Sequence, residues 1–319
     1  MDPHSPIIET HILTRDFKKT RAVDSLNLSI QPGELFGLVG PDGAGKTTTL
    51  RLLAGLLDIT SGEAQVAGHD LARHAEAVKR KIGYMAQRFS LYGELSVVEN
   101  LRFFADLYDV NVAELSKRME QLLTFAGLTE FKDRRAAQLS GGMQKKLALA
   151  CTLIHRPEIL LLDEPTTGVD PVSRREFWDI LTNLHLEGTT ILVSTPYMDE
   201  ADRCSRVGLL YEGRMIVCAE PRQIRAQIEG ELIELHPADW QAAYRLVETL
   251  PGVLEAQTYG ELLHVLVDSA EKRLPQIEAA LKNHGLAYEG ARRARARMEE
   301  AFISLITHLD ASQTPREAV

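Results

Sequence analysis

The sequence predicts an α/β fold, and two kinds of segment support this prediction. Residues 34–39 and 158–162 form largely apolar runs, which are typical of strands buried on both faces of a parallel sheet. Apolar residues within 50–57 recur at i, i+3, i+4 and i+7, the period of an amphipathic helix. With 319 residues the chain exceeds the usual size of one hydrophobic core, so a large domain and a smaller one are expected.

Composition and charge argue against several classes of protein. The net charge is -9, whereas a general nucleic-acid binder needs a basic face to neutralise phosphates. The sequence contains no run of about eighteen apolar residues, the length that a membrane-spanning helix needs. Residues 1–10 lack the basic and apolar regions of a secretory signal, so a cytoplasmic location is expected. Three cysteines have neither metal-ligand spacing nor the even count of a disulfide framework: Cys151, Cys204 and Cys218.

The N-terminal part predicts a small antiparallel layer followed by a phosphate-binding loop. Residues 7–14 and 22–30 have the composition of strands, and Pro32-Gly33 turns the chain into the strand at 34–39. The next segment matches the pattern of Gly, four residues, Gly, Lys and Ser or Thr. It consists of Gly40, Pro41, Asp42, Gly43, Ala44, Gly45, Lys46, Thr47 and Thr48.

A strand before this loop and a helix after it supply the expected structural context. The first backbone N–H groups of a helix lack internal partners and the macrodipole is positive there, so phosphate oxygens are stabilised. Lys46 would lie against the outer phosphates, and the Thr47 hydroxyl would complete the shell of a magnesium ion. A glycine-rich turn without a ligand is the simpler alternative, but it does not require Lys-Thr at this offset.

The middle of the chain predicts a helical insert in the α/β domain. A strand at 81–87 ends in Gln87, and helical periodicity follows at 97–108 and 113–126. Ser140-Gly141-Gly142 then opens another helix. This opening is half of a possible anion site, with a hydroxyl and free backbone donors, although an ordinary Ser N-cap explains it as well.

Two adjacent carboxylates, Asp163 and Glu164, end the apolar run at 158–162. The C-terminal end of such a strand faces the crevice where ligands of parallel sheets bind. Buried acids are costly unless a cation or water network holds them, so we expect a magnesium partner. Asp163 would hold the metal through its water shell, and Glu164 would orient or deprotonate an attacking water.

Together these motifs resemble those of the ATP-binding-cassette (ABC) ATPases, over roughly residues 7–227. The resemblance implies a P-loop NTPase domain at 1–229, with a RecA-like core and an antiparallel β subdomain. A helical subdomain would occupy about 88–155, and a small α+β accessory domain would occupy 230–319. In this family two cassettes pair head to tail, so residues 140–142 would complete the ATP site on the loop of a second cassette, in a homodimer or a heterodimer.

The resemblance also assigns roles to individual residues. Asp170 would lie in a loop that crosses the cassette interface, although an Asp N-cap before Pro171 explains it equally well. Gln87 would contact magnesium and the attacking water and report ATP binding to a membrane subunit, and Phe17 would stack on adenine. The cofactors are therefore ATP and Mg²⁺. The catalytic residues would be Glu164, Gln87 and Lys46, and the metal site would comprise Thr47, Gln87 and Asp163.

Further segments resemble the ATPases of daunorubicin-resistance and YbhF-like multidrug exporters, namely 168–175, 197–201 and 299–303. The implied function is that of an exporter ATPase, peripheral on the inner face of the cell membrane, which drives a separate polytopic permease through residues 88–99. The alternatives are a soluble cassette acting on DNA or ribosomes, and a slowly hydrolysing regulatory nucleotide sensor. The four arginines before the last helix predict a solvated helix face: Arg292, Arg293, Arg295 and Arg297.

Three residues depart from the family pattern. Asp42 replaces the usual Asn and places a carboxylate near the phosphates, and Met143 replaces a Gln at the end of the signature. Pro196 stands where the family has a switch histidine that contacts the γ-phosphate. Because proline cannot donate a hydrogen bond, hydrolysis by this chain is expected to be slow.

Overall fold

The computed structural model describes residues 5–88 and 91–313. The chain divides into two compact units, Met1–Pro221 and Arg222–Val319, at a point slightly before the predicted boundary at residue 229. Within the described residues, no helix combines the length and apolar character needed to cross a membrane.

A six-stranded sheet in the order β10-β9-β3-β8-β7-β6 forms the centre of the first unit. Its strands are β3 (Leu35–Val39), β6 (Ile82–Met85), β7 (Ile159–Asp163), β8 (Thr190–Thr195), β9 (Arg206–Tyr211) and β10 (Arg214–Ala219). All neighbours are parallel except β9 and β10. Every residue of β3, β7 and β8 is buried, as a strand covered on both faces requires.

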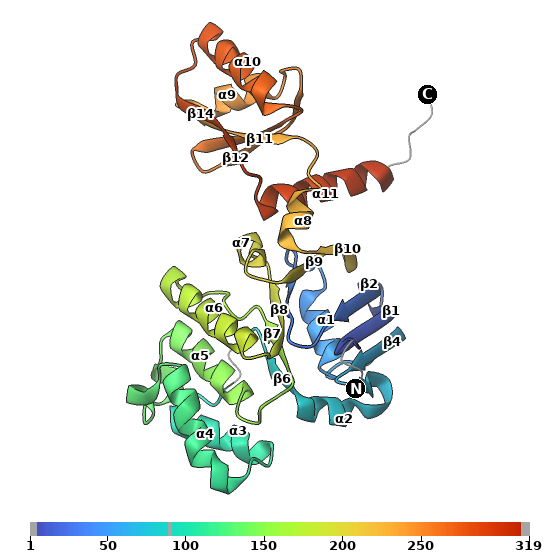
Figure 1. Ribbon diagram of the computed structural model, residues 1–319, viewed down its shortest axis with the longest axis vertical. Coiled ribbons are helices and arrows are strands. Elements are labelled where there is room, and N and C mark those ends of the chain that lie inside the picture. The colour runs from blue at the N-terminus through green and yellow to red at the C-terminus, as the bar shows by residue number, and fades with distance from the viewer. Residues whose placement is uncertain (1–4, 89–90, 314–319) are drawn as a thin grey trace. The chain divides into compact units, whose positions relative to one another are not determined.

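A second sheet in the order β2-β1-β4-β5 lies beside the central one (Figure 1). It contains β1 (Ile8–Phe17), β2 (Thr20–Ile30), β4 (Ser61–Val66) and β5 (His69–Asp70), and each pair is antiparallel. The antiparallel layer predicted from residues 7–14 and 22–30 is therefore present.

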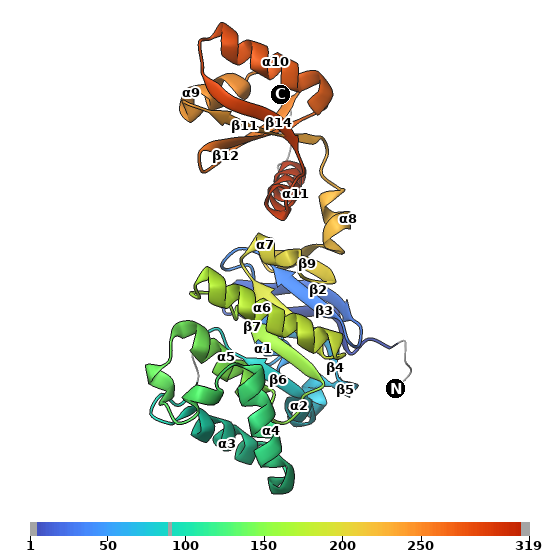
Figure 2. The same cartoon turned by 60° about the vertical axis from the view of Figure 1, so that its left-hand side comes forward.

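Helices flank the central sheet and form a separate lobe between β6 and β7. Those near the sheet are α1 (Lys46–Leu53), α2 (Leu71–Lys81), α6 (Pro171–Leu186) and α7 (Met198–Ala201). The lobe contains α3 (Val97–Leu107), α4 (Val112–Phe125), η1 (Thr129–Phe131), η2 (Ala136–Gln138) and α5 (Gly141–Thr152). Figure 2 shows α3, α4 and α5 grouped together, as the predicted helical insert requires.

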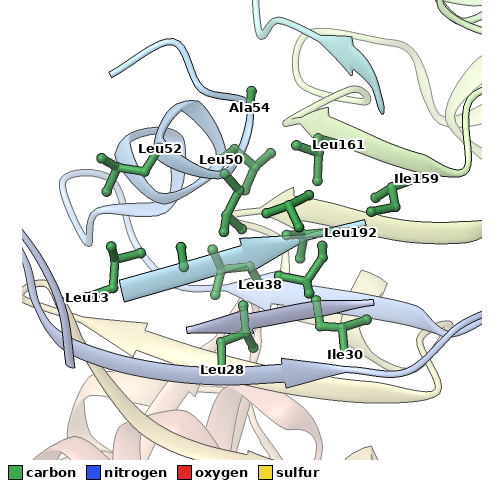
Figure 3. Packing of buried hydrophobic residues seen from close by; sticks show 14 of the residues in the cluster. Leu13, Leu28, Ile30, Leu38, Leu50, Leu52, Ala54, Ile159, Leu161 and Leu192 are labelled. Atoms are coloured by element: carbon green, nitrogen blue, oxygen red, sulfur yellow. The ribbon is translucent and has the colours of Figure 1, made fainter. Parts of the chain in front are cut away.

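The main hydrophobic core lies between the two sheets and α1 (Figure 3). Leu13 and Leu28 come from the antiparallel sheet, Leu38 and Leu192 from the central sheet, and Leu50 from α1. Complete burial of such a side chain contributes roughly 1.5–3 kcal/mol. This packing fixes α1, and hence the loop that precedes it, against the ends of the central strands.

The boundary between the units falls within α8 (Pro221–Arg225), after its first residue. The second unit contains a four-stranded antiparallel sheet in the order β12-β13-β11-β14. Its elements alternate as β11 (Glu231–Pro237), α9 (Trp240–Val247), β12 (Val253–Tyr259), β13 (Leu262–Val267), α10 (Ala270–Asn283) and β14 (Tyr288–Ala294). This βαββαβ arrangement is ferredoxin-like. Residues of α9 and α10 share one core with Ile233, Leu263 and Val265 of the strands.

The last helix, α11 (Met298–Gln313), meets residues that alternate with this core along the strands. Glu300 of α11 lies 2.6 Å from Nδ1 of His264, and Glu234 lies 3.7 Å from Nε2 of the same ring. All three side chains are buried. The prediction of a solvated helix face for the arginines was wrong about the helix, because Arg292 and Arg293 lie in β14 and pair with Glu234 and Glu231 of β11. Both side chains are nevertheless exposed.

Candidate active site

The phosphate-binding loop connects β3 to α1, and glycines allow its backbone to approach neighbouring strands. Gly43 and Gly45 have φ values of 81° and 102°, which favour glycine. A Cβ atom on Gly40 would lie 2.1 Å from the carbonyl oxygen of Leu210, so only glycine fits. Ala44 is buried and its carbonyl accepts a hydrogen bond from Gly213, which fixes the other side of the loop.

Lys46 turns back over this loop and is 3% exposed. Its Nζ donates hydrogen bonds of 2.8 and 2.9 Å to the carbonyl oxygens of Gly40 and Pro41. The same Nζ lies 3.3 Å from Oε1 of Glu164. Lys46 therefore links the phosphate loop to the end of β7 through a buried ion pair.

A cavity of about 320 Å³ opens beside the loop. The structure brings to it eight predicted residues of the loop and catalytic group and one that the sequence did not indicate, Ala22. Its lining is Ala22, Asp42, Gly43, Gly45, Lys46, Thr47, Thr48, Gln87 and Glu164. Backbone donors at a helix N-terminus, a lysine and a carboxylate thus converge on one space, which suits a phosphate ester.

Asp163 is fully buried at the end of β7 and accepts hydrogen bonds from neighbouring hydroxyls. Thr47 and Ser194 each donate to Oδ1 at 2.9 Å, and the Tyr84 hydroxyl lies 3.4 Å from Oδ2. Burial raises the pKa of Asp163, and the bonds from Thr47 and Ser194 oppose that shift. The carboxylate and the Thr47 hydroxyl are hard oxygen donors placed together.

This donor set fits magnesium. Among the described residues there is no group of three or more His, Cys, Asp or Glu side chains that would form a protein cage for a metal. Mg²⁺ keeps several waters and is usually held by one or two carboxylates together with substrate phosphates. Thr47 and Asp163 beside a phosphate cavity meet that requirement, and Gln87 lines the same cavity.

Glu164 has a strained backbone and a side chain held by three donors. Its φ is 46°, in the left-handed region that non-glycine residues rarely adopt. Its backbone N–H donates to the carbonyl and hydroxyl of Ser194, which holds this conformation. Gln87 Nε2 donates to Oε2 at 2.7 Å and Thr167 donates to the same atom at 3.2 Å, while Lys46 faces Oε1.

The predicted residues of the second anion site lie outside this cavity. Ser140 is the N-cap of α5 and accepts a hydrogen bond from the N–H of Met143. Asp170 caps α6 in the same way, accepting from Val172 and Ser173. Gly142 packs so closely on α6 that an added Cβ would lie 2.6 Å from the Ser173 side chain. The starts of α5 and α6 therefore form one surface of the first unit.

Within the described residues, 5–88 and 91–313, Phe17 is not among those that line the cavity. Phe17 is 40% exposed at the end of β1, and the Arg15 guanidinium lies 4.6 Å from the centroid of its ring. Stacking on a base would require one free face of this ring.

Several contacts of the site were not predicted from the sequence. Ser194 holds both Asp163 and the backbone of Glu164, and Lys145 donates to the backbone carbonyl of Gln87 at 2.7 Å. Burial lowers the pKa of Lys145, and the nearby carboxylates of Asp163 and Glu164 oppose this shift. The sequence feature that could have indicated the role of Ser194 is the pair of polar residues, Ser194 and Thr195, at the end of an otherwise apolar run.

The turn after β8 borders the phosphate loop. The carbonyl oxygen of Thr195 accepts a hydrogen bond of 3.4 Å from the N–H of Gly40. Pro196, which has no N–H donor, directly follows Thr195, the residue whose carbonyl binds the phosphate loop.

Comparison with known proteins agrees with this geometry. The model of the ABC transporter family matches residues 23–167. The chain is 43% identical over 225 residues, 70% of its length, to the probable multidrug ABC transporter ATP-binding protein YbhF of Escherichia coli (strain K12), and the match spans 39% of YbhF. It is 33% identical over 316 residues to the daunorubicin/doxorubicin resistance ATP-binding protein DrrA of Streptomyces peucetius, covering 98% of this chain and 96% of DrrA.

Solved structures show the same cassette fold. The dimeric post-hydrolysis state of the ATP-binding cassette MJ0796 bound to ADP and Pi has a TM-score of 0.62 and 27% identity, covering 67% of this chain and 98% of that one. CbiO1 from Clostridium perfringens, part of the ABC transporter complex cbiONQ, has a TM-score of 0.65 and 26% identity over 78% of this chain and 97% of its own. With the loop, the paired acids and the sheet order described above, these matches show that the chain belongs to the ATP-binding proteins of the ABC transporter family.

Proposed function

We propose that this chain is the ATP-binding subunit of an exporter, which binds and hydrolyses MgATP in a head-to-tail dimer and drives a separate membrane permease. The observation that carries the proposal is the convergence of Lys46, Gln87 and Glu164 on the phosphate-loop cavity. The near full-length match to a drug-resistance ATP-binding protein supports the export role.

In this mechanism the phosphate loop binds and orients the nucleotide. Its backbone N–H groups and Lys46 face the phosphates, and Lys46 exchanges its contact with Glu164 for phosphate oxygens. Thr47 and Asp163 would hold Mg²⁺, which when bound neutralises charge on the transferring phosphoryl group. Glu164 accepts a proton from the attacking water, and the amide of Gln87 orients the carboxylate and the water.

A second cassette supplies the rest of the site in this proposal. Ser140 and the glycines after it open α5 away from the cavity, where free helix N–H groups are available to phosphates bound on another chain. Asp170 at the start of α6 lies on the same surface, because Gly142 contacts Ser173. Each nucleotide would therefore lie between the phosphate loop of one chain and α5 of the other.

The proposed permease contact is the segment 88–99, together with the rest of α3, which begins within it at Val97. Residues 89–90 of this segment lie outside the described residues. Tyr92 is 50% exposed and packs edge-on against Phe103, with 4.6 Å between the ring centroids. The two rings present an aromatic surface. Gln87, just before the segment, contacts Glu164, so closure of the site can be transmitted to that surface. The chain would then be peripheral on the inner face of the cell membrane.

The proposal is tested by affinity purification of the chain from detergent-solubilised membranes, together with steady-state MgATP hydrolysis. We expect a polytopic membrane protein to co-purify and to stimulate hydrolysis. Recovery of ribosomes or DNA in its place would indicate a soluble cassette of another class. Tight MgATP binding with no hydrolysis, alone or with the permease, would favour the regulatory sensor that Pro196 also suggests.

A further inference from the structure

Glu200 is a buried carboxylate to which the mechanism above gives no role. It lies in α7 and is 1% exposed. Both of its oxygens accept hydrogen bonds, from Thr166 Oγ1 to Oε1 at 2.8 Å and from Thr195 Oγ1 to Oε2 at 2.6 Å. A buried carboxylate is tolerated only when it is bonded in this way, so its position is strongly determined by these partners.

The two hydroxyls belong to segments that leave neighbouring strands of the central sheet. Thr166 follows Glu164 by two residues after β7, and Thr195 is the last residue of β8, directly before Pro196. Both threonines are almost completely buried. Thr195 Oγ1 also accepts a hydrogen bond from the N–H of Tyr197 at 3.0 Å, which closes the turn around Pro196.

A third contact extends to the start of α6. Arg174 Nε lies 3.8 Å from Oε1 of Glu200, and the Arg174 guanidinium lies 5.0 Å from the centroid of the Tyr197 ring. The backbone N–H of Arg174 donates to the carbonyl of Asp170, the residue that caps α6. One carboxylate thus contacts the segment after β7, the turn after β8 and the first turn of α6.

These connections reach the phosphate loop and the segment after Glu164. The carbonyl of Thr195 accepts from Gly40 of the phosphate loop, and Thr166 lies in the segment that begins with the strained residue Glu164. We propose that Glu200 is a positioning residue for ATP hydrolysis, which holds Glu164 and the turn at Pro196 in fixed relation to the phosphate loop. The turn at Pro196 is held by the Thr195 hydroxyl, which donates to Glu200 and accepts from the N–H of Tyr197. This inference rests on the proposed function.

The first test is Glu200→Gln in the full chain, with MgATP as substrate. Glutamine keeps the size of the side chain but replaces one acceptor oxygen by a donor, so one threonine hydroxyl loses its acceptor. We expect kcat to fall about ten- to a hundredfold, the loss that follows from one charge-assisted hydrogen bond, and KM for MgATP to stay within about twofold. Asp199→Asn is the matched control, because Asp199 is the neighbouring acid, contacts the same Arg174, and is 57% exposed. Its kcat should be unchanged.

A double-mutant cycle tests whether Glu200 acts through the segment of Glu164. Thr166→Val removes the hydroxyl that bonds Oε1, and we expect its combination with Glu200→Gln to lower kcat by less than the product of the single effects. If Glu200→Gln does not fold, Thr166→Val and Thr195→Val carry the test alone with the same expected loss of kcat. Melting temperatures of all variants separate this role from a contribution to folding.

Three results would overturn the inference. One is an unchanged kcat in folded Glu200→Gln, another is a raised KM at constant kcat, and the third is a cycle in which the effects simply multiply. Hydrolysis by the wild-type chain distinguishes failure of this inference from failure of the proposed function. Its absence would overturn the proposed function, whereas normal wild-type hydrolysis with unaffected variants would overturn only the role of Glu200.

Discussion

Asp163 and Glu164 are adjacent in the sequence but have different surroundings. Asp163 accepts bonds from hydroxyls of Thr47 and Ser194, whereas Glu164 faces the cavity with Lys46 and the Gln87 amide beside it. Successive residues of a regular strand point to opposite faces, and Glu164 follows the last residue of β7 with a left-handed φ of 46°. One carboxylate is therefore suited to a metal and the other to a water molecule.

Glu164→Gln is expected to trap an ATP-bound dimer. The amide keeps the shape of the side chain and an acceptor oxygen but cannot take a proton, so nucleotide binding survives and hydrolysis falls about a hundredfold or more. Light scattering with MgATP measures the dimer, and a phosphate-release assay measures turnover. A variant that stays monomeric with MgATP would contradict the head-to-tail model.

Pro196→His is expected to increase hydrolysis. An imidazole restores a donor to the turn that borders Gly40, and a charge-assisted bond of roughly 1.5–3 kcal/mol corresponds to about ten- to a hundredfold in rate. Steady-state kcat should be measured alone and with the permease, beside Pro196→Ala, which removes the ring without adding a donor. If histidine and alanine behave alike, the missing donor does not limit the rate.

At the scale of elements, the sequence predicted the helices, strands and loops that are encoded by a pattern of consecutive residues. The loop and the start of α1, the buried strand β7 and the Ser-capped start of α5 are encoded in consecutive residues. The strand β14 was not predicted, because the pairing of its arginines with Glu231 and Glu234 of β11 brings together segments distant in the chain. Ser194 was missed for the same reason, since only the parallel register with β7 places it against Asp163.

The contact between α5 and α6 gives a prediction with an internal control. Gly142→Ala should destabilise the first unit by roughly 1–3 kcal/mol, because its Cβ would lie 2.6 Å from the Ser173 side chain. Gly141→Ala should have little effect on stability, since a Cβ there meets nothing within 4 Å. Urea unfolding of the two variants measures the difference, and equal stabilities would contradict the tight packing.

The attachment of α11 to the second unit should depend on pH. Burial by itself would raise the pKa of Glu300, but hydrogen bonds from His264 and from the N–H of Arg297 outweigh it, so the pKa lies below the ordinary 4.5. A lowered pKa means that ionised Glu300 stabilises the folded unit above pH 4.5 and that this contribution is lost as the pH falls through the folded pKa.

Glu300→Gln is therefore expected to destabilise the second unit by about 1 kcal/mol at pH 7 and by less in acid. Trp240 lies in α9, so its fluorescence in a Trp178→Phe background reports urea unfolding of this unit. Glu299→Gln serves as the control on the same turn. A difference that persists unchanged as the pH falls through the acid unfolding of the unit would exclude the ionised contact with His264 as its cause.

At the scale of the whole molecule, the phosphate loop and the start of α5 belong to one chain but would serve different nucleotides. A mixture of Lys46→Ala and Ser140→Arg chains tests this arrangement, since each variant alone lacks part of every site. In a heterodimer one site takes its loop from the Ser140→Arg chain and its α5 from the Lys46→Ala chain. With random pairing and independent sites, about a quarter of wild-type hydrolysis should return. A mixture as inactive as its components would exclude a shared site.

The buried pair of Lys46 and Glu164 has a consequence for the order of events in the proposed reaction. Lys46 contacts Glu164 and donates to two loop carbonyls, so the two charges neutralise each other. Phosphate oxygens that bind Lys46 would compete with Glu164 for this cation and would leave the carboxylate with the neutral donors Gln87 and Thr167. In the proposed mechanism, binding of the substrate and release of the general base would then be a single event.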